Sequence, residues 1–303
     1  MIRVHVNDPL EKDALEVLKS KPQLTVTCEH LEKDKLLAIM PEIEVLIVRS
    51  ATKVTSDLIE RGTRLKLICR AGVGLDNIDV EAAQKRGIKV LNTPGASAIS
   101  VAELTFGLML SAARHIPRGT MDLKNGLWTK KELEGVELFN KTLGIIGLGT
   151  IGKEVAKRAI AFGMNVVAYD PYVKHFEGVR LTNLDELYGV SDFITLHVPL
   201  TKETRHLINA SAIAKMKDGV IIVNASRGGV IDEAALYDAL VARKVYAAAL
   251  DVFELEPPND ELRKKLLQLP NVVATPHIGA STIEAQSRVA KELLQKLFEE
   301  LKI

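Results

Sequence analysis

Short β-branched runs alternate with helical patterns along nearly the whole chain. In the first ninety residues the pattern predicts strands at 2–6, 45–48, 66–70 and 88–91. Helices are predicted between and beside these strands, at 10–19, 31–40, 55–61 and 79–86. Strands that alternate with helices in this way are typical of a parallel sheet with crossover helices. The first ninety residues therefore predict one complete small α/β unit.

A second series of the same kind begins with a strand pattern at 142–146. Further strands are predicted at 164–169, 192–197, 219–224, 246–252 and 272–275. The last pattern, at 282–302, is helical and has no strand after it. The expected fold class is therefore α/β, with two domains of Rossmann or flavodoxin type. Each domain should be a parallel sheet with crossover helices, and a ligand cleft is expected between the two.

The segment between the two series is predicted to be a long, buried helix. Ser100 and Glu103 have the Ser-x-x-Glu spacing of a capping box, which predicts the start of a helix. The residues that follow, to about His115, are apolar on nearly every face of such a helix. A helix of this kind needs to be covered on all sides, so we expect it at a domain junction or a subunit interface.

Composition narrows the class of protein. The 303 residues suffice for two domains, and 47% hydrophobic with 26% charged residues is ordinary for a globular protein. The chain has 40 Lys and Arg against 39 Asp and Glu, which gives no broad attraction for polyanions. Nucleic acid is therefore not expected as a partner.

No segment is long and apolar enough to suggest a membrane partner. The first six residues form a strand pattern rather than a signal peptide, and no stretch reaches the roughly 20 apolar residues that span a bilayer. We expect a soluble, cytoplasmic protein. Cys28 and Cys69 lack metal-ligand spacing, so no metal is expected. His197 and His206 are expected to pack at strand ends.

A glycine-rich motif directly follows the strand pattern at 142–146. It contains Gly147, Gly149 and Gly152, and a helical pattern comes after it. The first glycine permits a tight turn, the second lets the backbone approach a pyrophosphate, and the third allows close packing of helix on strand. Because a helix N-terminus supplies N–H groups to an anion, Thr150 and Ile151 are also expected to contact a dinucleotide.

An acidic residue, Asp170, stands at the end of the next predicted strand. A carboxylate at this position can accept hydrogen bonds from the adenosine ribose hydroxyls and would repel a 2′-phosphate. The expected cofactor is therefore NAD rather than NADP.

Four charged residues lie near the ends of later strands or in the loops that follow them. They are Arg227, Asp251, Glu256 and His277. In doubly wound sheets this edge forms the ligand crevice. Oxidation of a 2-hydroxy acid needs a cation for the carboxylate, a base for the hydroxyl proton and a hydride acceptor. Arginine, histidine and NAD meet these three needs.

Over essentially its whole length the chain resembles the D-2-hydroxyacid dehydrogenase family. Three family motifs occur in order, Asn-x-x-Arg-Gly-Gly with Arg227, Glu-x-Glu-Pro with Glu256, and Pro-His-x-Gly with His277. By this resemblance Arg227 binds the substrate carboxylate and His277 is the catalytic acid/base. Glu256 orients and charges His277, and Asp251 lies near the nicotinamide carboxamide.

The resemblance also implies a domain division and an assembly. Residues 1–96 together with 281–303 are expected to bind the substrate, and residues 97–280 to form the inserted NAD-binding Rossmann domain. A homodimer through the nucleotide domains is expected, and the apolar helix at 100–115 supports it.

Within the family, the first domain most resembles the members that oxidise D-3-phosphoglycerate to 3-phosphohydroxypyruvate, the first step of serine biosynthesis. The resemblance rests on residues 48–53, 70–79 and 279–286. It implies a phosphorylated 2-hydroxy acid as substrate. The expected substrate contacts are the cations Arg49, Arg70, Lys130 and Lys131, together with Ser50, Gly72 and Gly74.

Two alternatives stay open at this point. The chain could be a glyoxylate or hydroxypyruvate reductase, because the Arg-Glu-His set is shared across the family. It could also be an NAD-sensing binding protein, like the co-repressors built on this fold. Long members that act on 3-phosphoglycerate carry a C-terminal regulatory domain linked to serine feedback. Since this chain ends at Ile303, inhibition by serine is not expected.

Overall fold

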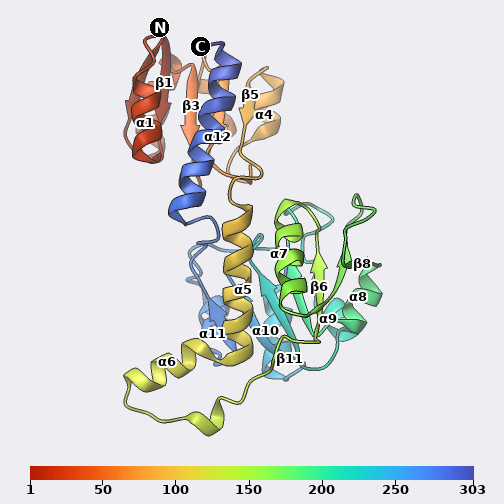
Figure 1. Cartoon of the computed structure of the whole chain (residues 1–303). Coiled ribbons are helices and arrows are strands. Elements are labelled where there is room, and N and C mark those ends of the chain that lie inside the picture. The colour runs from red at the N-terminus through yellow and green to blue at the C-terminus, as the bar shows by residue number, and fades with distance from the viewer. The chain divides into compact units, whose positions relative to one another are not determined.

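The computed structural model describes all residues, Met1–Ile303 (Figure 1). The chain forms two compact units. The first unit consists of Met1–Ser97 and Ala280–Ile303, and the second unit is Ala98–Gly279. Each unit has one parallel sheet with helices on both of its faces. The predicted α/β fold class is thereby confirmed.

The first unit has a five-stranded sheet in the order β2-β1-β3-β4-β5. Its strands are β1 (Ile2–Val6), β2 (Leu24–Cys28), β3 (Val45–Val48), β4 (Leu67–Arg70) and β5 (Lys89–Leu91). Its helices are α1 (Lys12–Lys19), α2 (Lys33–Ile39), the 3₁₀ helix η1 (Met40–Glu42), α3 (Ser56–Arg61), α4 (Val80–Lys85) and α12 (Ile283–Leu301).

The C-terminal helix α12 completes the core of the first unit. Strand β3 is buried on both faces, and its alternate residues enter two different cores. Val45 and Ile47 face α1 and α12, whereas Leu46 and Val48 face α2, α3 and α4. Leu293 of α12 is fully buried in the first of these cores. Residues from both ends of the chain therefore stabilise the same sheet.

The second unit has a seven-stranded sheet in the order β12-β11-β10-β9-β6-β7-β8. Its strands are β6 (Thr142–Ile146), β7 (Asn165–Tyr169), β8 (Val179–Leu181), β9 (Phe193–Leu196), β10 (Val220–Asn224), β11 (Val245–Leu250) and β12 (Val272–Ala274). Its helices are α5 (Ala98–Arg114), α6 (Ile116–Lys124), the 3₁₀ helix η2 (Lys130–Glu132), α7 (Thr150–Ala161), α8 (Leu184–Val190), α9 (Ala210–Lys215), α10 (Glu233–Val241) and α11 (Glu261–Gln268).

The strand order reverses beside β6. The chain runs outward from β6 through β7 to β8, then returns to β9 on the other side of β6 and continues to β12. Ligands of doubly wound sheets bind outside the carboxyl ends of the strands at such a reversal. Gly147 follows β6 directly and therefore stands at this point.

Two edge strands of the structure were not predicted. Strand β2 pairs only with β1, and most of its side chains are partly or fully exposed. Strand β8 has three residues, none of them buried, and pairs only with β7. A strand at the edge of a sheet buries little, so its sequence lacks the continuous apolar run of a central strand.

The predicted capping box at Ser100 is wrong. Helix α5 begins at Ala98, and the hydroxyl of Ser100 donates a hydrogen bond to the carbonyl oxygen of Gly279 at 2.7 Å. Glu103 instead forms an ion pair with Arg158 of α7, with 3.2 Å between Oε1 and Nη2. Both side chains of the predicted capping box therefore bind residues distant in sequence and do not cap the helix.

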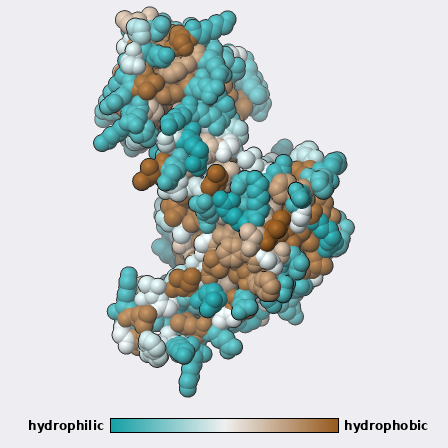
Figure 2. Space-filling view, in the orientation of Figure 1, coloured by the Kyte–Doolittle hydropathy of each residue, from teal (hydrophilic) through white to brown (hydrophobic).

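Residues 116–140, here called the arm, extend from the end of α5 (Figure 1). Neither α6 nor η2 has a buried residue. The exposed large apolar residues of the arm are Ile116, Met121, Leu123, Leu127, Trp128 and Phe139. Figure 2 shows hydrophobic residues both on the arm and on the neighbouring surface of the second unit. No helix of the chain is both long enough and apolar enough to cross a membrane.

The place of α12 in the first core predicts the effect of two truncations on one helix. Leu293→Ala should lower the free energy of unfolding by about 2–5 kcal/mol, because it leaves a cavity in the core. Ile283→Ala, at a position 87% exposed on the same helix, should change it by less than about 0.5 kcal/mol. Unfolding in guanidinium chloride, followed by circular dichroism, measures both. Equal effects would contradict the packing described for α12.

Candidate active site

The glycine motif forms a tight loop between β6 and α7. Gly147 has φ of 95°, which favours glycine, and a side chain there would collide with the carbonyl oxygen of His197. A side chain at Gly152 would collide with the carbonyl oxygen of Gly147. Around Gly149 there is open space, and no side chain caps the first turn of α7. The N–H groups at the start of α7 therefore have no capping side chain, and it is here that the sequence predicts the pyrophosphate contacts of Thr150 and Ile151.

Asp170 connects this loop to the end of β7. Its carboxylate accepts hydrogen bonds from the backbone N–H groups of Leu148 at 2.7 Å, Tyr172 at 2.8 Å and Val173 at 3.0 Å. A carboxylate has about four acceptor positions, so Asp170 can still accept a hydrogen bond from a ribose hydroxyl. Its negative charge lies beside the glycine loop, as the sequence predicts.

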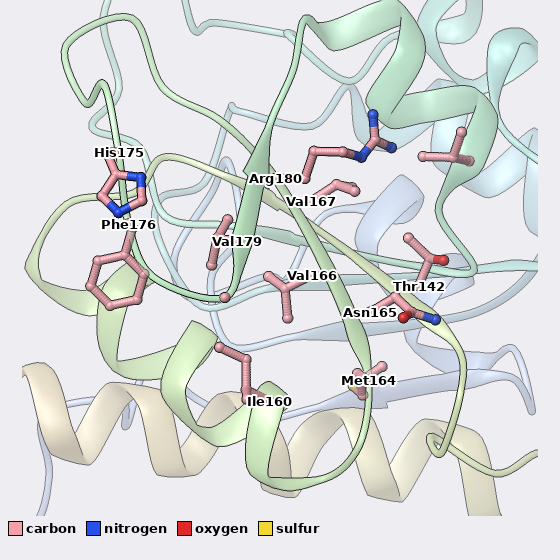
Figure 3. Close-up of a pocket in the computed structure, with 12 residues that line it drawn as sticks. Thr142, Ile160, Met164, Asn165, Val166, Val167, His175, Phe176, Val179 and Arg180 are labelled. Carbon is pink, nitrogen blue, oxygen red and sulfur yellow. The ribbon is translucent and has the colours of Figure 1, made fainter.

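The second unit has a pocket of about 570 Å³ (Figure 3). It lies at the edge of the sheet opposite to the one that carries the glycine loop. Thr142, Asn165 and Val179 line it, and these residues begin β6, β7 and β8. Because the strands are parallel, this edge is the amino-terminal one. The glycine loop and Asp170 lie at the carboxyl edge. The pocket is therefore not the dinucleotide site.

The loop after β10 is folded by the side chain of Asn224. Its oxygen accepts hydrogen bonds from the N–H and the hydroxyl of Ser226, and its nitrogen donates to the carbonyl oxygen of Arg227 at 2.9 Å. A side chain at Gly228 would collide with the backbone of Phe253 and Glu254. Only glycine therefore lets the loop that carries Arg227 lie against the loop after β11.

Glu256 and His277 form a close pair at the carboxyl edge of the second sheet. Nδ1 of His277 lies 2.8 Å from Oε2 of Glu256, and Oε1 of Glu256 accepts a hydrogen bond from the N–H of Phe253 at 3.1 Å. Burial alone would raise the pKa of Glu256. Hydrogen bonds from His277 and Phe253, with the charges of His277 and Arg227, nevertheless lower this pKa below its usual value. Glu256 is therefore ionised at neutral pH, and Arg227 is close enough to contribute.

The loop that carries His277 wraps around the carboxylate of Asp251. This carboxylate, in a residue only 1% exposed, accepts hydrogen bonds from the hydroxyl of Thr275 at 2.6 Å and from the N–H groups of Ile278 and Gly279 at 2.8 Å. The N–H of His277 donates to the carbonyl oxygen of Asp251 at 2.8 Å. His277 itself has φ of 53°, in the left-handed region. Such conformations persist in non-glycine residues where surrounding contacts enforce them.

In the first unit, Arg49 and Arg70 lie at the carboxyl ends of adjacent strands. Arg49 follows β3 and Arg70 ends β4, where it is in register with Val48. The exposed Ser50 comes next after Arg49. Gly72 has φ of 150°, and a side chain there would collide with the guanidinium of Arg70. These residues, with Gly74 in the same loop, are brought to one edge of the sheet.

Two residues that the sequence did not single out hold the turn of Arg49. The buried carboxylate of Asp8 accepts hydrogen bonds from the N–H of Arg49 at 2.6 Å, and from the hydroxyl of Thr52 at 2.7 Å. The side-chain nitrogen of Asn77 donates to the carbonyl oxygens of Arg49 and Thr52, both at 2.6 Å. The only available signal was the position of Asp8, two residues after the end of a strand.

The structure does not bring Lys130 and Lys131 to the His277 edge of their own unit. Both are exposed on the arm, which leaves the C-terminal end of α5. The start of α5 carries the contact between Ser100 and Gly279. The 17 residues of α5 span about 25 Å at roughly 1.5 Å per residue. The lysine pair and His277 therefore lie near opposite ends of α5, and the length of this helix separates them.

His197 fits a packing role. Its Nε2 lies 3.0 Å from the hydroxyl of Thr195, and burial lowers its pKa to about 3. His206 lies partly exposed beside Glu254.

Asp170 gives a prediction about cofactor choice. The protein should use NAD in preference to NADP, because a 2′-phosphate would meet the Asp170 carboxylate. Asp170→Ala should narrow this preference, measured as the ratio of kcat/KM values for the two cofactors. Equal use of NADP and NAD by the unmodified protein would contradict this role of Asp170.

Comparison with known proteins gives the family. Residues 106–279 match the model of the D-isomer specific 2-hydroxyacid dehydrogenase NAD-binding domain. The chain is 66% identical over 302 residues to the hydroxypyruvate reductase of Thermotoga maritima, with 99% of both chains covered. It is 56% identical over 291 residues to the D-3-phosphoglycerate dehydrogenase of Methanocaldococcus jannaschii, covering 94% of this chain and 55% of that protein. The chain thus spans about half the length of this second relative.

A solved structure resembles the chain over nearly its whole length. It is the D-lactate dehydrogenase of Aquifex aeolicus complexed with NAD and lactic acid, with a TM-score of 0.89 and 34% identity. The match covers 99% of this chain and 95% of that one. The predicted family and the predicted cofactor, NAD, are both confirmed. The chain belongs to the D-isomer-specific 2-hydroxyacid dehydrogenases, and its second unit holds their NAD-binding domain.

Proposed function

We propose that the chain transfers hydride at C2 of a three-carbon D-2-hydroxy acid, with His277 as the acid/base. The observation that carries this proposal is the 2.8 Å contact between His277 Nδ1 and Glu256 Oε2. A proton held on Nδ1 by the carboxylate leaves Nε2 as the atom that exchanges a proton with the substrate. The side chain of His277 is also accessible to a ligand.

In the proposed reaction the C2 hydroxyl exchanges a proton with one group, and C2 itself exchanges a hydride with another. In oxidation, the neutral imidazole of His277 takes the C2 hydroxyl proton at Nε2 while the C2–H bond breaks. A dinucleotide held at the glycine loop would supply the hydride acceptor for oxidation, as NAD, and the hydride donor for reduction, as NADH. The carboxylate of Glu256 stabilises the imidazolium that forms. Arg227 binds the substrate carboxylate through two parallel hydrogen bonds and so fixes the position of C2.

Our first candidate substrate is D-3-phosphoglycerate. Arg49 and Arg70 close two neighbouring strands, which are about 5 Å apart in a sheet. Two guanidinium groups that reach the same ligand suit a phosphate dianion better than a hydroxyl group. An unphosphorylated acid offers no second anion to such a pair of cations. The arginine pair therefore supports oxidation of 3-phosphoglycerate to 3-phosphohydroxypyruvate, the first step of serine biosynthesis.

The second candidate is reduction of hydroxypyruvate. It is favoured by the 66% identity to the Thermotoga maritima hydroxypyruvate reductase, which matches this chain end to end. Both candidates act on the same three-carbon skeleton and use the same Arg227, Glu256 and His277. They differ in one chemical group, the phosphate on C3, and the substrate experiment below is built on that difference.

We further propose a homodimer formed through α5. The exposed positions of α5 are Ile99, Glu103, Gly107 and Arg114, which lie on one stripe of the helix. If α5 packed antiparallel against α5 of a second copy, with the two helices meeting next to Gly107, Glu103 of one copy would lie near Arg114 of the other. The charges at these positions are opposite and therefore complementary. Burial of Trp128, now 81% exposed, would remove an unfavourable apolar surface.

The same pairing gives Lys130 and Lys131 a role in substrate binding. In an antiparallel pair, the arm that leaves the end of one α5 lies near the start of the other. Gly279, two residues after His277, contacts that start. The lysine pair would thus serve the site of the second copy rather than its own.

The proposed acid/base predicts both a rate loss and a pH dependence. His277→Ala should lower kcat by about 10²–10⁴-fold. Oxidation needs the neutral imidazole and should speed up as the pH rises, whereas reduction needs the imidazolium and should slow down. Glu256→Gln removes the negative charge that favours the imidazolium, so both profiles should move to lower pH. Full activity of His277→Ala would exclude His277 as the acid/base.

The substrate proposal predicts that kcat/KM for 3-phosphoglycerate exceeds that for glycerate by at least about tenfold. A charged hydrogen bond contributes roughly 1.5–3 kcal/mol, which is one to two decades in affinity. Arg49→Ala should erase most of the difference and spare glycerate. Arg61→Ala, which removes an exposed arginine at the end of α3, should leave the ratio unchanged. Equal rates with both acids in the unmodified protein would favour hydroxypyruvate reduction.

The homodimer proposal predicts a mass twice the 33.2 kDa of one chain in light scattering at micromolar concentration. Gly107→Glu should give monomers, because it sets a charge in the middle of the proposed interface. Gly107 is exposed, and no atom outside the nearby helix backbone lies within 4 Å of a Cβ placed there, so the chain itself leaves room for the change. Gly189→Glu, equally open on α8, is the matched control and should stay dimeric. A monomeric unmodified protein would refute the proposal.

A further inference from the structure

A group of charged residues lies behind the loop that carries Glu256. Its centre is Arg263 of α11, whose side chain is 11% exposed. Nε of Arg263 forms an ion pair with Oε2 of Glu233 at 2.7 Å, without the geometry of a hydrogen bond, and Nη2 donates a hydrogen bond to Oε2 of Glu254 at 2.9 Å. Nη1 pairs with the carboxylate of Asp260. One guanidinium thus binds three carboxylates, from α10, from the loop after β11 and from the start of α11.

Glu254 is held from several sides by this group. Its N–H donates a hydrogen bond to Oε1 of Glu233 at 2.8 Å, and its carboxylate pairs with Arg263 and His206. The N–H of His206, in turn, donates to the carbonyl oxygen of Gly229 at 2.8 Å. The group therefore connects the Glu254 segment to the end of the Arg227-Gly228-Gly229 turn.

The Glu254 segment lies directly against both parts of the proposed catalytic set. Glu256 is two residues further on, and its carboxylate accepts a hydrogen bond from the N–H of Phe253. On the other side, the backbone of Phe253 and Glu254 fills the space that a side chain at Gly228 would need. A shift of this segment would move Glu256 away from His277 and would also disturb the turn of Arg227.

Arg263 is the only cation that contacts Glu233 in this group. Glu233 is buried, and burial raises its pKa, whereas the charge of Arg263 opposes that rise. Without Arg263, three carboxylates would remain close together, one of them buried without a partner cation. Such an arrangement is strongly unfavourable, so the loop would have to move or Glu233 would have to take up a proton.

From these contacts we infer that Arg263 is a positioning residue for the Glu256–His277 pair, acting through Glu254 and the backbone of Phe253. The inference rests on the proposed role of Glu256 and His277. Lysine cannot replace arginine here, because a single ammonium group cannot present three separate edges to three carboxylates.

The test measures kcat, KM and the pH profile in Arg263→Lys. We expect kcat to fall by about 10- to 100-fold, the cost of misplacing a catalytic group by roughly an ångström. The pH profile should move to lower pH, as in Glu256→Gln, because the imidazolium loses its nearby carboxylate. Lys265→Met, which removes an exposed ion pair with Glu261 on the same helix, should have neither effect. Glu254→Gln, which keeps Glu233 paired with Arg263, should give the same shift with a smaller loss of kcat.

A double variant separates positioning from loss of stability. If Arg263 acts through Glu256, Arg263→Lys combined with Glu256→Gln should show no further pH shift beyond that of Glu256→Gln alone. Leu266→Ala, which removes a fully buried side chain of α11, should lower Tm without moving the pH profile. An unshifted profile in both Arg263→Lys and Glu254→Gln, with a shifted one in Glu256→Gln, would overturn the inference and keep the proposed function. An unshifted profile in Glu256→Gln would overturn the proposed function itself.

Discussion

The geometry of the candidate site depends on one buried carboxylate, that of Asp251. A charge that is almost fully removed from water is tolerated only where donors surround it, and Asp251 receives two N–H groups and one hydroxyl from a single loop. The donors belong to Thr275, Ile278 and Gly279, so the loop has to curl around the carboxylate. His277, in the middle of this curl, adopts a left-handed backbone and turns its ring toward Glu256. The position of the His277 imidazole thus follows from the hydrogen bonds that the same loop donates to the Asp251 carboxylate.

This arrangement gives Asp251 a structural role in addition to the role expected from the resemblance. The resemblance placed it near the nicotinamide carboxamide, and that role remains a prediction. In the structure both of its carboxylate oxygens accept hydrogen bonds from the loop that follows β12. The contacts make Asp251 a residue that fixes its neighbours. They also explain why an acidic side chain at the end of a central strand is buried rather than directed to solvent.

Much of the fold and part of the site could be predicted from sequence because the signals are local. A central strand such as β3 is apolar at every position. Gly147 is favoured by its own positive φ, and Gly152 is required by the nearby carbonyl oxygen of Gly147. Edge strands β2 and β8 escaped prediction because they bury little. The capping box failed because the hydroxyl of Ser100 binds Gly279, which is 179 positions away. The contacts of Asp8 with Thr52 and of Arg263 with Glu233 likewise join distant segments, and no local pattern contains them.

The return of α12 to the first unit has a consequence for the order in which the protein is made. The sheet of the first unit is complete once β5 has been synthesised, but the face that α1 covers still lacks Leu293 and Leu297. All of the second unit, Ala98–Gly279, is synthesised before those residues. Domains generally fold as units during synthesis. The apolar face of the first sheet therefore stays without α12 until Ala98–Gly279 has been synthesised, so the core of the first unit cannot be completed before then.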